Sequence, residues 1–160
     1  QRTAHKMGIR SNASMLYGHI ETLEERVDHL LSLRALQDET GGFQTFICFP
    51  FHPGNTELEA THQRTSLWDE LKTMAISRLM LDNFSNIKAY WVMLTLPIAQ
   101  LALGFGANDI DWTVSEEKIM HAAGAKSDTF LTQETIIETI RQIGRIPVER
   151  DSMYQIIRTL

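Results

Sequence analysis

Polar and aromatic side chains suited to binding a small molecule recur along the chain, each directly after or near the end of a segment expected to form a strand. They include two histidines, which act as general acids, bases or metal ligands, and amide and hydroxyl groups, which bind carboxylates. The candidates for substrate contact are His19, His52, Asn55, Trp91 and Thr113. Two histidines without a nearby pair of carboxylates at ligand spacing are a weak metal signal, so as functional residues they suit substrate binding better than metal binding.

Strands and helices alternate in the segments that must position these side chains. Strands are expected where apolar and β-branched residues are continuous or alternate, at residues 11–17, 43–49, 87–94 and 107–111. Helices are expected where apolar residues recur at helical spacing, at about residues 22–38, 66–79, 98–103, 114–122 and 132–143. Thr22 with Glu25 three residues later is a capping box, and Gly41 and Gly42 are expected to end the first long helix.

This βα repeat predicts a parallel sheet, in which the carboxyl ends of all strands meet at one edge and build the binding site. Four βα units in about 115 residues are too few for a complete eight-fold barrel, which needs roughly 250 residues. Two architectures therefore stay open: a small doubly wound sheet, and half of a barrel.

The composition excludes several classes of protein. The chain has 160 residues, of which 43% are hydrophobic and 22% charged, with a net charge of −5 and one cysteine. One cysteine cannot form an intrachain disulfide or hold a cysteine-ligated cluster by itself, and a negative net charge argues against nucleic-acid binding. The longest apolar stretch, residues 89–103, is interrupted and too short to cross a membrane. We therefore expect a cytoplasmic protein with a small-molecule substrate and with neither a nucleic-acid nor a membrane partner.

Each candidate also has a structural interpretation. A lone histidine in a loop is more often a surface residue than a ligand, and Trp91 suits the core better than the site. Glu21 stabilises the start of the following helix through the helix dipole, whether or not it has a further function. Cys48 lies in the middle of a strand, where a buried, unreactive thiol is favoured over a nucleophile.

Longer blocks of sequence carry a resemblance to a known enzyme family. The blocks are residues 11–22, 36–47, 51–53, 78–84, 88–91, 116–119 and 147–151. Together they resemble the C-terminal half of the aminofutalosine synthases, which are radical S-adenosylmethionine (SAM) enzymes of the futalosine route to menaquinone. Two sister families, the dehypoxanthine futalosine cyclases and the deazaflavin chromophore synthases, share a block similar to residues 17–22. Residues 88–91 and 148–151 look more like the synthase than the cyclase.

The resemblance implies the C-terminal half of a radical SAM (β/α) barrel of the TIM type. Residues 1–125 would supply βα units five to eight, and residues 126–160 a helical C-terminal extension. The [4Fe–4S] cluster would be held by a CxxxCxxC loop in the N-terminal half, with no metal ligand in this chain. The residues on the SAM side would be Leu16, Gly18, Glu21 and Ile47, and no catalytic residue is assigned. Trp112 stands where a glycine is expected, which bears on how open the loop at Thr113 is.

The implied reaction joins the adenosyl group of SAM to 3-[(1-carboxyvinyl)oxy]benzoate, with loss of bicarbonate. The start at Gln1, without a methionine, is interpreted as a cut inside a domain. We expect this chain alone to show neither cluster absorbance nor SAM cleavage. We also expect it to self-associate, because half a barrel leaves open strand edges and an uncovered apolar inner face. The alternative of another class is a non-catalytic binding or assembly domain derived from a barrel.

Overall fold

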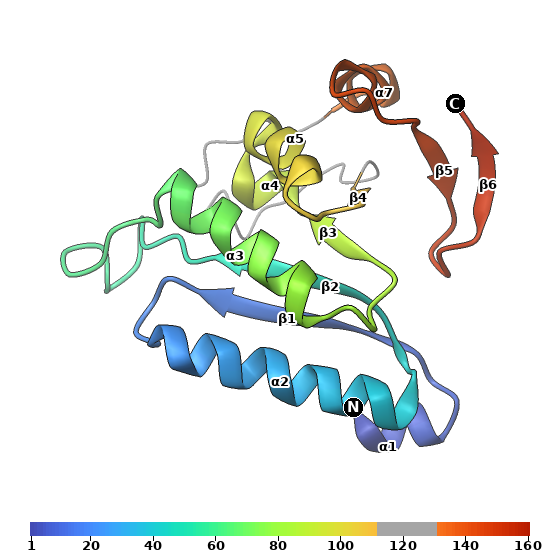
Figure 1. Cartoon of the computed structure of the whole chain (residues 1–160). Helices are drawn as coiled ribbons and strands as arrows, with labels where there is room; N and C mark the ends of the chain where they lie inside the picture. Colours follow the sequence, from blue (N-terminus) through green and yellow to red (C-terminus); the bar gives the residue numbers. More distant parts are fainter. Residues whose placement is uncertain (112–130) are drawn as a thin grey trace.

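The computed structural model describes residues 1–111 and 131–160, and its centre is a parallel sheet of four strands (Figure 1). The strands are β1 (Ser11–Tyr17), β2 (Phe43–Pro50), β3 (Ile87–Ala89) and β4 (Asp109–Ile110). A short helix, α1 (Arg2–Lys6), precedes the sheet. Thr113, Trp112 and the helix expected at residues 114–122 lie outside the described residues.

The strands lie side by side in the order in which the chain makes them, β1-β2-β3-β4, and every neighbouring pair is parallel. The connecting helices are α2 (Leu23–Thr40), α3 (Leu67–Met80) and α5 (Leu96–Gly104). Helix α3 packs against both α2 and α5, so the helices share one face of the sheet. A doubly wound sheet reverses its strand order and covers both faces. The chain is therefore α/β with the architecture of half a (β/α) barrel.

Helix ends follow the local sequence signals. Thr22 Oγ1 accepts a hydrogen bond from the Glu25 N–H at 3.2 Å, and the Glu25 carboxylate accepts from the Thr22 N–H at 2.7 Å, so the predicted capping box is confirmed. Gly41 ends α2 in the left-handed conformation with φ of 58°. The Ser66 hydroxyl caps α3 by accepting from the Asp69 N–H at 3.2 Å. Both long helices therefore begin where predicted, and α2 ends at the predicted glycines.

The two faces of the sheet have different environments. On β1, Ala13, Met15 and Tyr17 are buried beneath the helices, whereas Leu16 between them is 55% exposed. Alternate residues of a strand point to opposite faces, so Leu16 marks the face that carries no helix, here called the open face. That face corresponds to the inside of a barrel.

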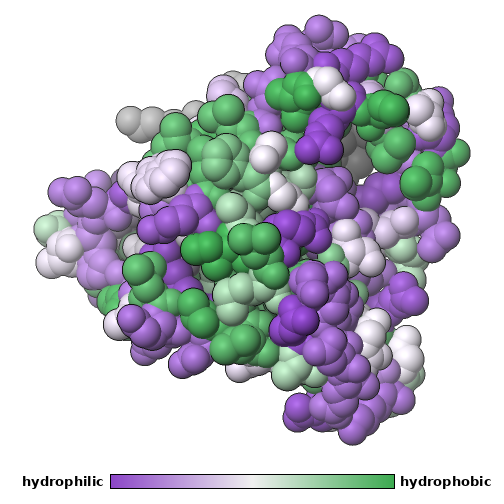
Figure 2. Space-filling model, viewed as in Figure 1, coloured by the Kyte–Doolittle hydropathy of each residue, from purple (hydrophilic) through white to green (hydrophobic). Residues whose placement is uncertain are grey.

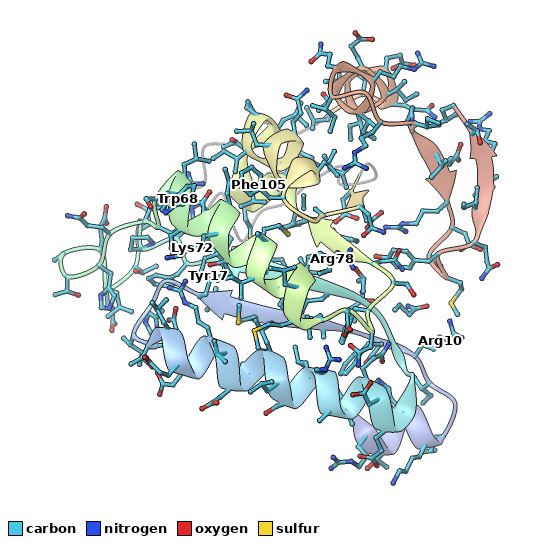
Figure 3. All side chains as sticks on the ribbon, in the orientation of Figure 1. Arg10, Tyr17, Trp68, Lys72, Arg78 and Phe105 are labelled. Atoms are coloured by element: carbon cyan, nitrogen blue, oxygen red, sulfur yellow. The ribbon has the colours of Figure 1, made fainter. Side chains whose placement is uncertain are left out.

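Outer surfaces of the helices carry apolar side chains as well. Figure 2 shows apolar side chains gathered over α3, where Leu79 is 78% exposed. Figure 3 shows Arg78 of α3 beside the loops at the amino ends of β3 and β4, where it donates to the carbonyls of Phe84 and Gly106 at 2.9 and 2.7 Å. Within residues 1–111 and 131–160, no helix combines the length and the apolar character needed to cross a membrane.

The strand predicted at residues 87–94 is wrong in its second half. β3 ends at Ala89, and residues Trp91–Leu94 form a short helix, α4, in which all four side chains are buried. Thr95 then adopts a φ of 81°, and α5 begins at once. A continuous apolar run fits a buried strand and a buried helix equally well, which is why periodicity misassigned it. The fourth strand, expected at residues 107–111, is also shorter, because only Asp109 and Ile110 pair.

The C-terminal extension is helical only in its first part. Helix α7 (Gln133–Gln142) buries Ile136 and packs Ile140 against the core, as its spacing predicts. Two antiparallel strands then form a hairpin, β5 (Val148–Arg150) and β6 (Ile156–Thr159), where a helical extension was expected. The prediction missed this hairpin because strands of three and four residues carry too few side chains to show a period of two.

Candidate functional site

Contacts at the carboxyl edge join the segments that follow β1 and β2. The Phe51 N–H donates to the Tyr17 carbonyl at 2.8 Å and so holds the two strand ends together. The ring of His19 lies 4.6 Å from that of Phe51 and stacks on that of His62 at 5.3 Å. His19 is thus part of an aromatic group at this edge, and His62 is a member that the sequence analysis missed.

Similar contacts join β2 to β3 and β3 to β4. Nε2 of His52 donates to the Met93 carbonyl of α4 at 2.9 Å. Nε1 of Trp91 donates to the Asp111 carbonyl at 2.7 Å, directly after β4. The structure therefore brings His19, His52 and Trp91 to one edge, as the strand pattern predicts.

The turn after β1 is shaped by Gly18 and Glu21. Gly18 has a φ of 82°, which glycine adopts without strain. A Cβ at this position would lie 2.2 Å from Cγ2 of Thr65, so the methyl group of Thr65 needs the space that glycine leaves. The Glu21 carboxylate accepts from the Gly18 N–H and, at 2.9 Å, from the His19 N–H. The Glu21 carboxylate therefore holds the conformation of this turn through two hydrogen bonds to its backbone.

Arg26 joins this turn to α3. Its Nε bonds the Glu21 carboxylate at 2.8 Å, and its Nη1 bonds the Asp69 carboxylate at 3.0 Å and the Thr73 hydroxyl at 3.2 Å. The guanidinium also lies over the ring of Tyr17, 4.9 Å from its centroid, in a cation–π contact. Burial acts to raise the pKa of Glu21, but the two N–H donors and Arg26 outweigh it and lower that pKa. Glu21 is thus a charged, structural part of the turn, and its contact with SAM stays a prediction.

Leu16 and Ile47 both lie on the open face, and their contact with SAM stays a prediction. Ile47 pairs with Ser14 on one side and Lys88 on the other, and Leu16 pairs with Phe49, so the two apolar side chains lie diagonally across neighbouring strands. A cavity of about 210 Å³ at the free edge of β1 is lined in part by Leu16 and Glu21. The exposed apolar surface at Leu16 suits an apolar or flat ligand.

His52 and Asn55 belong to the segment between β2 and α3. Burial first, and the nearby Arg64 cation second, lower the pKa of His52, so it is a neutral donor to Met93. Asn55 has a φ of 57°, which asparagine tolerates, and its N–H donates to the Glu59 carboxylate at 3.1 Å. The structure shows how both residues are held, and their contact with substrate stays a prediction.

Replacing His52 with glutamine is expected to flatten the acid dependence of stability. The unfolded imidazole takes up a proton below about pH 6.5, whereas the folded one resists it, so the wild-type protein loses stability as the pH falls through this range. Glutamine keeps a donor for Met93 and does not titrate. Melting temperatures at pH 7.5 and 5.5 measure the effect, with His52→Ala expected to be less stable at both values. Equal slopes in wild type and His52→Gln would contradict the prediction.

Trp91 and Cys48 follow their structural interpretations. Trp91 is 1% exposed and belongs to the core, with only its indole N–H used at the edge of the sheet. Cys48 is buried under α3, 4.0 Å from the sulfur of Met74, and burial raises the pKa of its thiol to about 12. A thiol with that pKa is protonated at neutral pH and is a poor nucleophile.

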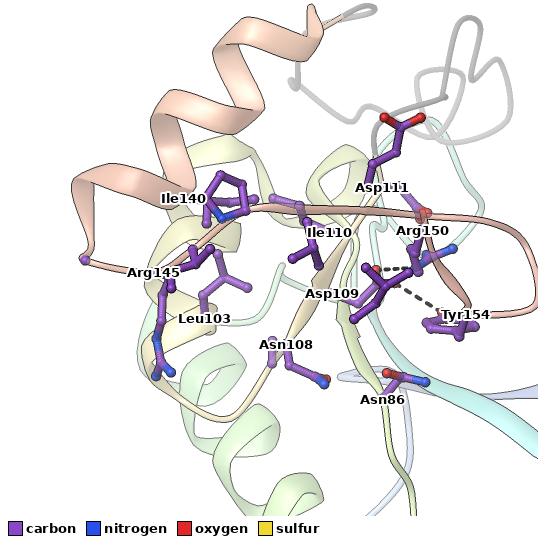
Figure 4. A pocket seen from close by; sticks show the side chains of 17 residues that line it. Asn86, Leu103, Asn108, Asp109, Ile110, Asp111, Ile140, Arg145, Arg150 and Tyr154 are labelled. Atoms are coloured by element: carbon purple, nitrogen blue, oxygen red, sulfur yellow. Dashed lines mark hydrogen bonds and ion pairs between the residues drawn. The ribbon is translucent and has the colours of Figure 1, made fainter. Parts of the chain in front are cut away.

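Two cations on the open face, Lys88 and Arg150, were not predicted from the sequence, whereas Asp109 and Asp111 follow from the end of the fourth strand. Lys88 is 8% exposed and bonds the Asp111 carboxylate at 2.7 Å, and Arg150 of the hairpin bonds Asp109. Asp109, Asp111 and Arg150 line a cavity of about 700 Å³ between β4, α7 and the hairpin (Figure 4). The signal that could have found Lys88 is a lysine between Ile87 and Ala89 in an otherwise apolar strand, because a buried lysine requires a partner.

Metal-ligating side chains do not cluster in the part of the chain that the structure describes. Among those residues, no three or more histidine, cysteine, aspartate or glutamate side chains are grouped so as to hold a metal ion. The buried Cys48 stands alone in its strand. The described residues therefore do not fit an iron–sulfur cluster, whereas the open face at Leu16 and Ile47 fits an apolar ligand.

Comparison with known proteins gives consistent matches over nearly the whole chain. The chain is 49% identical to aminodeoxyfutalosine synthase of Thermus thermophilus and 44% identical to that of Streptomyces coelicolor, over 98% of the chain and 43% of each relative. It is also 42% identical to a 5-amino-6-(D-ribitylamino)uracil–L-tyrosine 4-hydroxyphenyl transferase of Archaeoglobus fulgidus, over 98% of the chain and 46% of that protein. The chain thus spans less than half the length of these relatives.

These matches confirm the resemblance stated from the sequence blocks. The protein family described as the CofH/MqnC C-terminal region matches residues 40–160, from the end of α2 to the end of the hairpin. The match covers the second, third and fourth strands and the whole C-terminal extension. The chain therefore belongs to the CofH/MqnC C-terminal region family.

Proposed function

We propose that this chain is the C-terminal half of a radical SAM aminofutalosine synthase, an enzyme of menaquinone biosynthesis. The observation that carries the proposal is 49% identity to an aminodeoxyfutalosine synthase over 98% of the chain. The proposed reaction joins the adenosyl group of SAM to 3-[(1-carboxyvinyl)oxy]benzoate with loss of bicarbonate, in the cytoplasm. The half barrel supports this assignment because its open face and carboxyl edge are where a barrel enzyme binds its ligands.

The residues of this chain would hold the reactants. Leu16 and Ile47 would pack against the adenine, and the Gly18 turn, closed by Glu21, would bring backbone close to the nucleoside. SAM and its cluster, when bound, supply the adenosyl radical chemistry. His19, His52, Asn55 and Thr113 would orient the two carboxylates of the benzoate substrate, and the buried Trp91 would support the edge through its indole N–H. Holding two reactants together and away from water supplies much of the rate enhancement of such enzymes.

A second candidate within the same class is the deazaflavin chromophore synthase reaction. The observation that favours it is the 42% identity to the Archaeoglobus fulgidus transferase, which is close to the values for the two synthases. The dehypoxanthine futalosine cyclase reaction, from the sister family that the sequence resembles, is a third candidate. A non-catalytic binding or assembly domain is the alternative of another class, and turnover by the full-length protein would exclude it.

The deciding experiment is a turnover assay of the full-length protein that contains these 160 residues. The protein, reconstituted with iron and sulfide, is given SAM, a reductant and one substrate set at a time. We expect an adenosyl-containing product with 3-[(1-carboxyvinyl)oxy]benzoate and none when the reductant is omitted. Product formed only from L-tyrosine and 5-amino-6-(D-ribitylamino)uracil would replace the proposal by the second candidate, and no product from any set would reject both.

Two expectations concern this chain by itself. Inactivity of the isolated chain, with no cluster absorbance and no SAM cleavage, stays a prediction. Self-association through the open face and the free edge of β1 likewise stays a prediction, which light scattering can test. The first follows from the single cysteine, which cannot hold a cluster by itself, and the second from the strand edges and inner face that half a barrel leaves uncovered.

A further inference from the structure

Four charged side chains form a continuous line across the sheet, from the C-terminal hairpin to the carboxyl edge. Arg150 of β5 bonds Asp109, the first residue of β4. Lys88 of β3 lies between Asp109, at 3.6 Å, and Asp111, at 2.7 Å. Their exposed side-chain fractions are 23% for Arg150, 9% for Asp109, 10% for Lys88 and 20% for Asp111. Two cations and two anions alternate, so the line is neutral as a whole.

Asp109 is held mainly by the hairpin (Figure 4). The guanidinium of Arg150 bonds both carboxylate oxygens at 2.7 Å, in the bidentate geometry that arginine provides. The Tyr154 hydroxyl donates to the same carboxylate at 3.1 Å. Arg150 also lies 3.9 Å from the centroid of the Tyr154 ring, which fixes the direction of its guanidinium.

Which of the two aspartates Lys88 bonds more closely depends on the partners that Asp109 already has. An ammonium on a flexible four-carbon stem can reach either carboxylate. Because Arg150 and Tyr154 already satisfy Asp109, the shorter bond of Lys88 goes to Asp111. The carbonyl of Asp111 accepts from the indole of Trp91 in α4, so the same residue joins the end of β4 to the segment after β3. The position of Asp111 at the carboxyl edge is thus linked, through Lys88 and Asp109, to the C-terminal hairpin.

We propose that Arg150 is a positioning residue, which acts through Asp109 and Lys88 to hold Asp111 and the Trp91 contact at the edge where substrate binds. The proposal rests on the proposed function only in placing the substrate at that edge. When Arg150 is removed, Asp109 loses its main partner in a poorly exposed site, where an unpaired charge is costly. Lys88 then turns toward Asp109, Asp111 loses its cation, and the ends of β3 and β4 separate.

The test compares two arginine variants of one hairpin in the full-length protein. Arg150→Gln removes the bidentate partner of Asp109. Arg158→Gln is the matched control, because Arg158 also makes a 2.7 Å ion pair, with Glu149, but is 59% exposed and does not reach the sheet. For Arg150→Gln we expect the KM for the benzoate substrate to rise about tenfold with kcat changed less than about threefold, the pattern of lost substrate positioning. For Arg158→Gln we expect both constants to stay at wild-type values.

Hydrogen exchange measures the same link without turnover. Arg150→Gln is expected to speed amide exchange in residues 90–94 and 107–111, and Arg158→Gln is not. This readout separates the inference from the proposed function, because it remains valid when the enzyme uses another substrate. Wild-type exchange in both segments of Arg150→Gln would overturn the inference, as would a fall in kcat with unchanged KM.

Two further variants keep the test decisive. If Arg150→Gln fails to fold, Arg150→Lys retains the charge without the bidentate geometry, and its exchange at residues 107–111 is expected to lie between those of wild type and of Asp111→Asn. In the double variant Arg150→Gln/Asp111→Asn, the KM is expected to match that of Asp111→Asn alone, because both changes disrupt the same series of ion pairs. An additive rise in KM would show that Arg150 acts by another route.

Discussion

Replacing Arg26 with methionine lowers the free energy of unfolding by about 3–5 kcal/mol, the cost of leaving a poorly exposed ion pair without one partner. Arg26 is the shared cation of Glu21 and Asp69, and the three side chains are 13%, 19% and 24% exposed. Methionine keeps much of the aliphatic volume but leaves two carboxylates facing each other without a counter-charge. The cation–π contact with Tyr17 is lost at the same time.

Urea denaturation of the full-length protein measures this loss, and Arg2→Met is the matched control. Arg2 also makes a 2.8 Å ion pair, with Glu39, but it is 61% exposed. Exposed pairs contribute little, so the control should stay within about 0.5 kcal/mol of wild type. A loss of less than about 1 kcal/mol in Arg26→Met would show that this buried network is not a main source of stability.

Replacing Gly18 with alanine lowers the free energy of unfolding by about 2–4 kcal/mol and weakens SAM binding. The positive φ costs a residue with a side chain about 1–2 kcal/mol, and the new methyl group would overlap Cγ2 of Thr65, at a typical cost of about 1–3 kcal/mol. The turn relieves this overlap by moving, which displaces the N–H groups that Glu21 holds. Under the proposed function, the affinity for SAM should fall about tenfold, a loss of about 1.4 kcal/mol.

Two further variants separate the backbone cost of the positive φ at Gly18 from the cost of the steric overlap with Thr65. Gly8→Ala is a matched control, since Gly8 has a φ of 81° but no atom within 4 Å of an added Cβ, so it carries the backbone cost alone. Adding Thr65→Ser to Gly18→Ala removes the clashing methyl group and keeps the hydroxyl that donates to Glu70 at 2.9 Å. We expect this double variant to recover stability to the level of Gly8→Ala. Equal losses in Gly18→Ala with and without Thr65→Ser would show that Thr65 is not the obstacle.

The elements that could be predicted are those whose signals lie within a few residues. Thr22 and Glu25 are three residues apart and cap α2, and Gly41 ends it in the predicted place. The alternation of buried and exposed residues in β1 follows directly from its sequence. The edge at which both His19 and His52 lie was also predictable, because parallel strands fix which strand ends lie together.

What could not be predicted depends on residues far apart in the chain. Arg26 and Asp69 are separated by 43 positions, and Asp109 and Arg150 by 41, so no local pattern pairs them. The short helix Trp91–Leu94 was misassigned because burial on all sides erases the periodicity that separates helix from strand. Glu21 was placed on the SAM side by the resemblance alone, and the contacts of its carboxylate with its own turn and with Arg26 became visible only in the structure.

The sequential order of the strands has a consequence for folding kinetics. Each strand pairs with the strand that the chain makes just before or after it, so every pairing closes a loop of only about 20 to 40 residues. A parallel sheet built in this way has a low contact order for its class, and each βα unit can add to the one already formed. We expect assembly of these four strands to proceed along the chain, with β1 and β2 pairing before β3 and β4 are added.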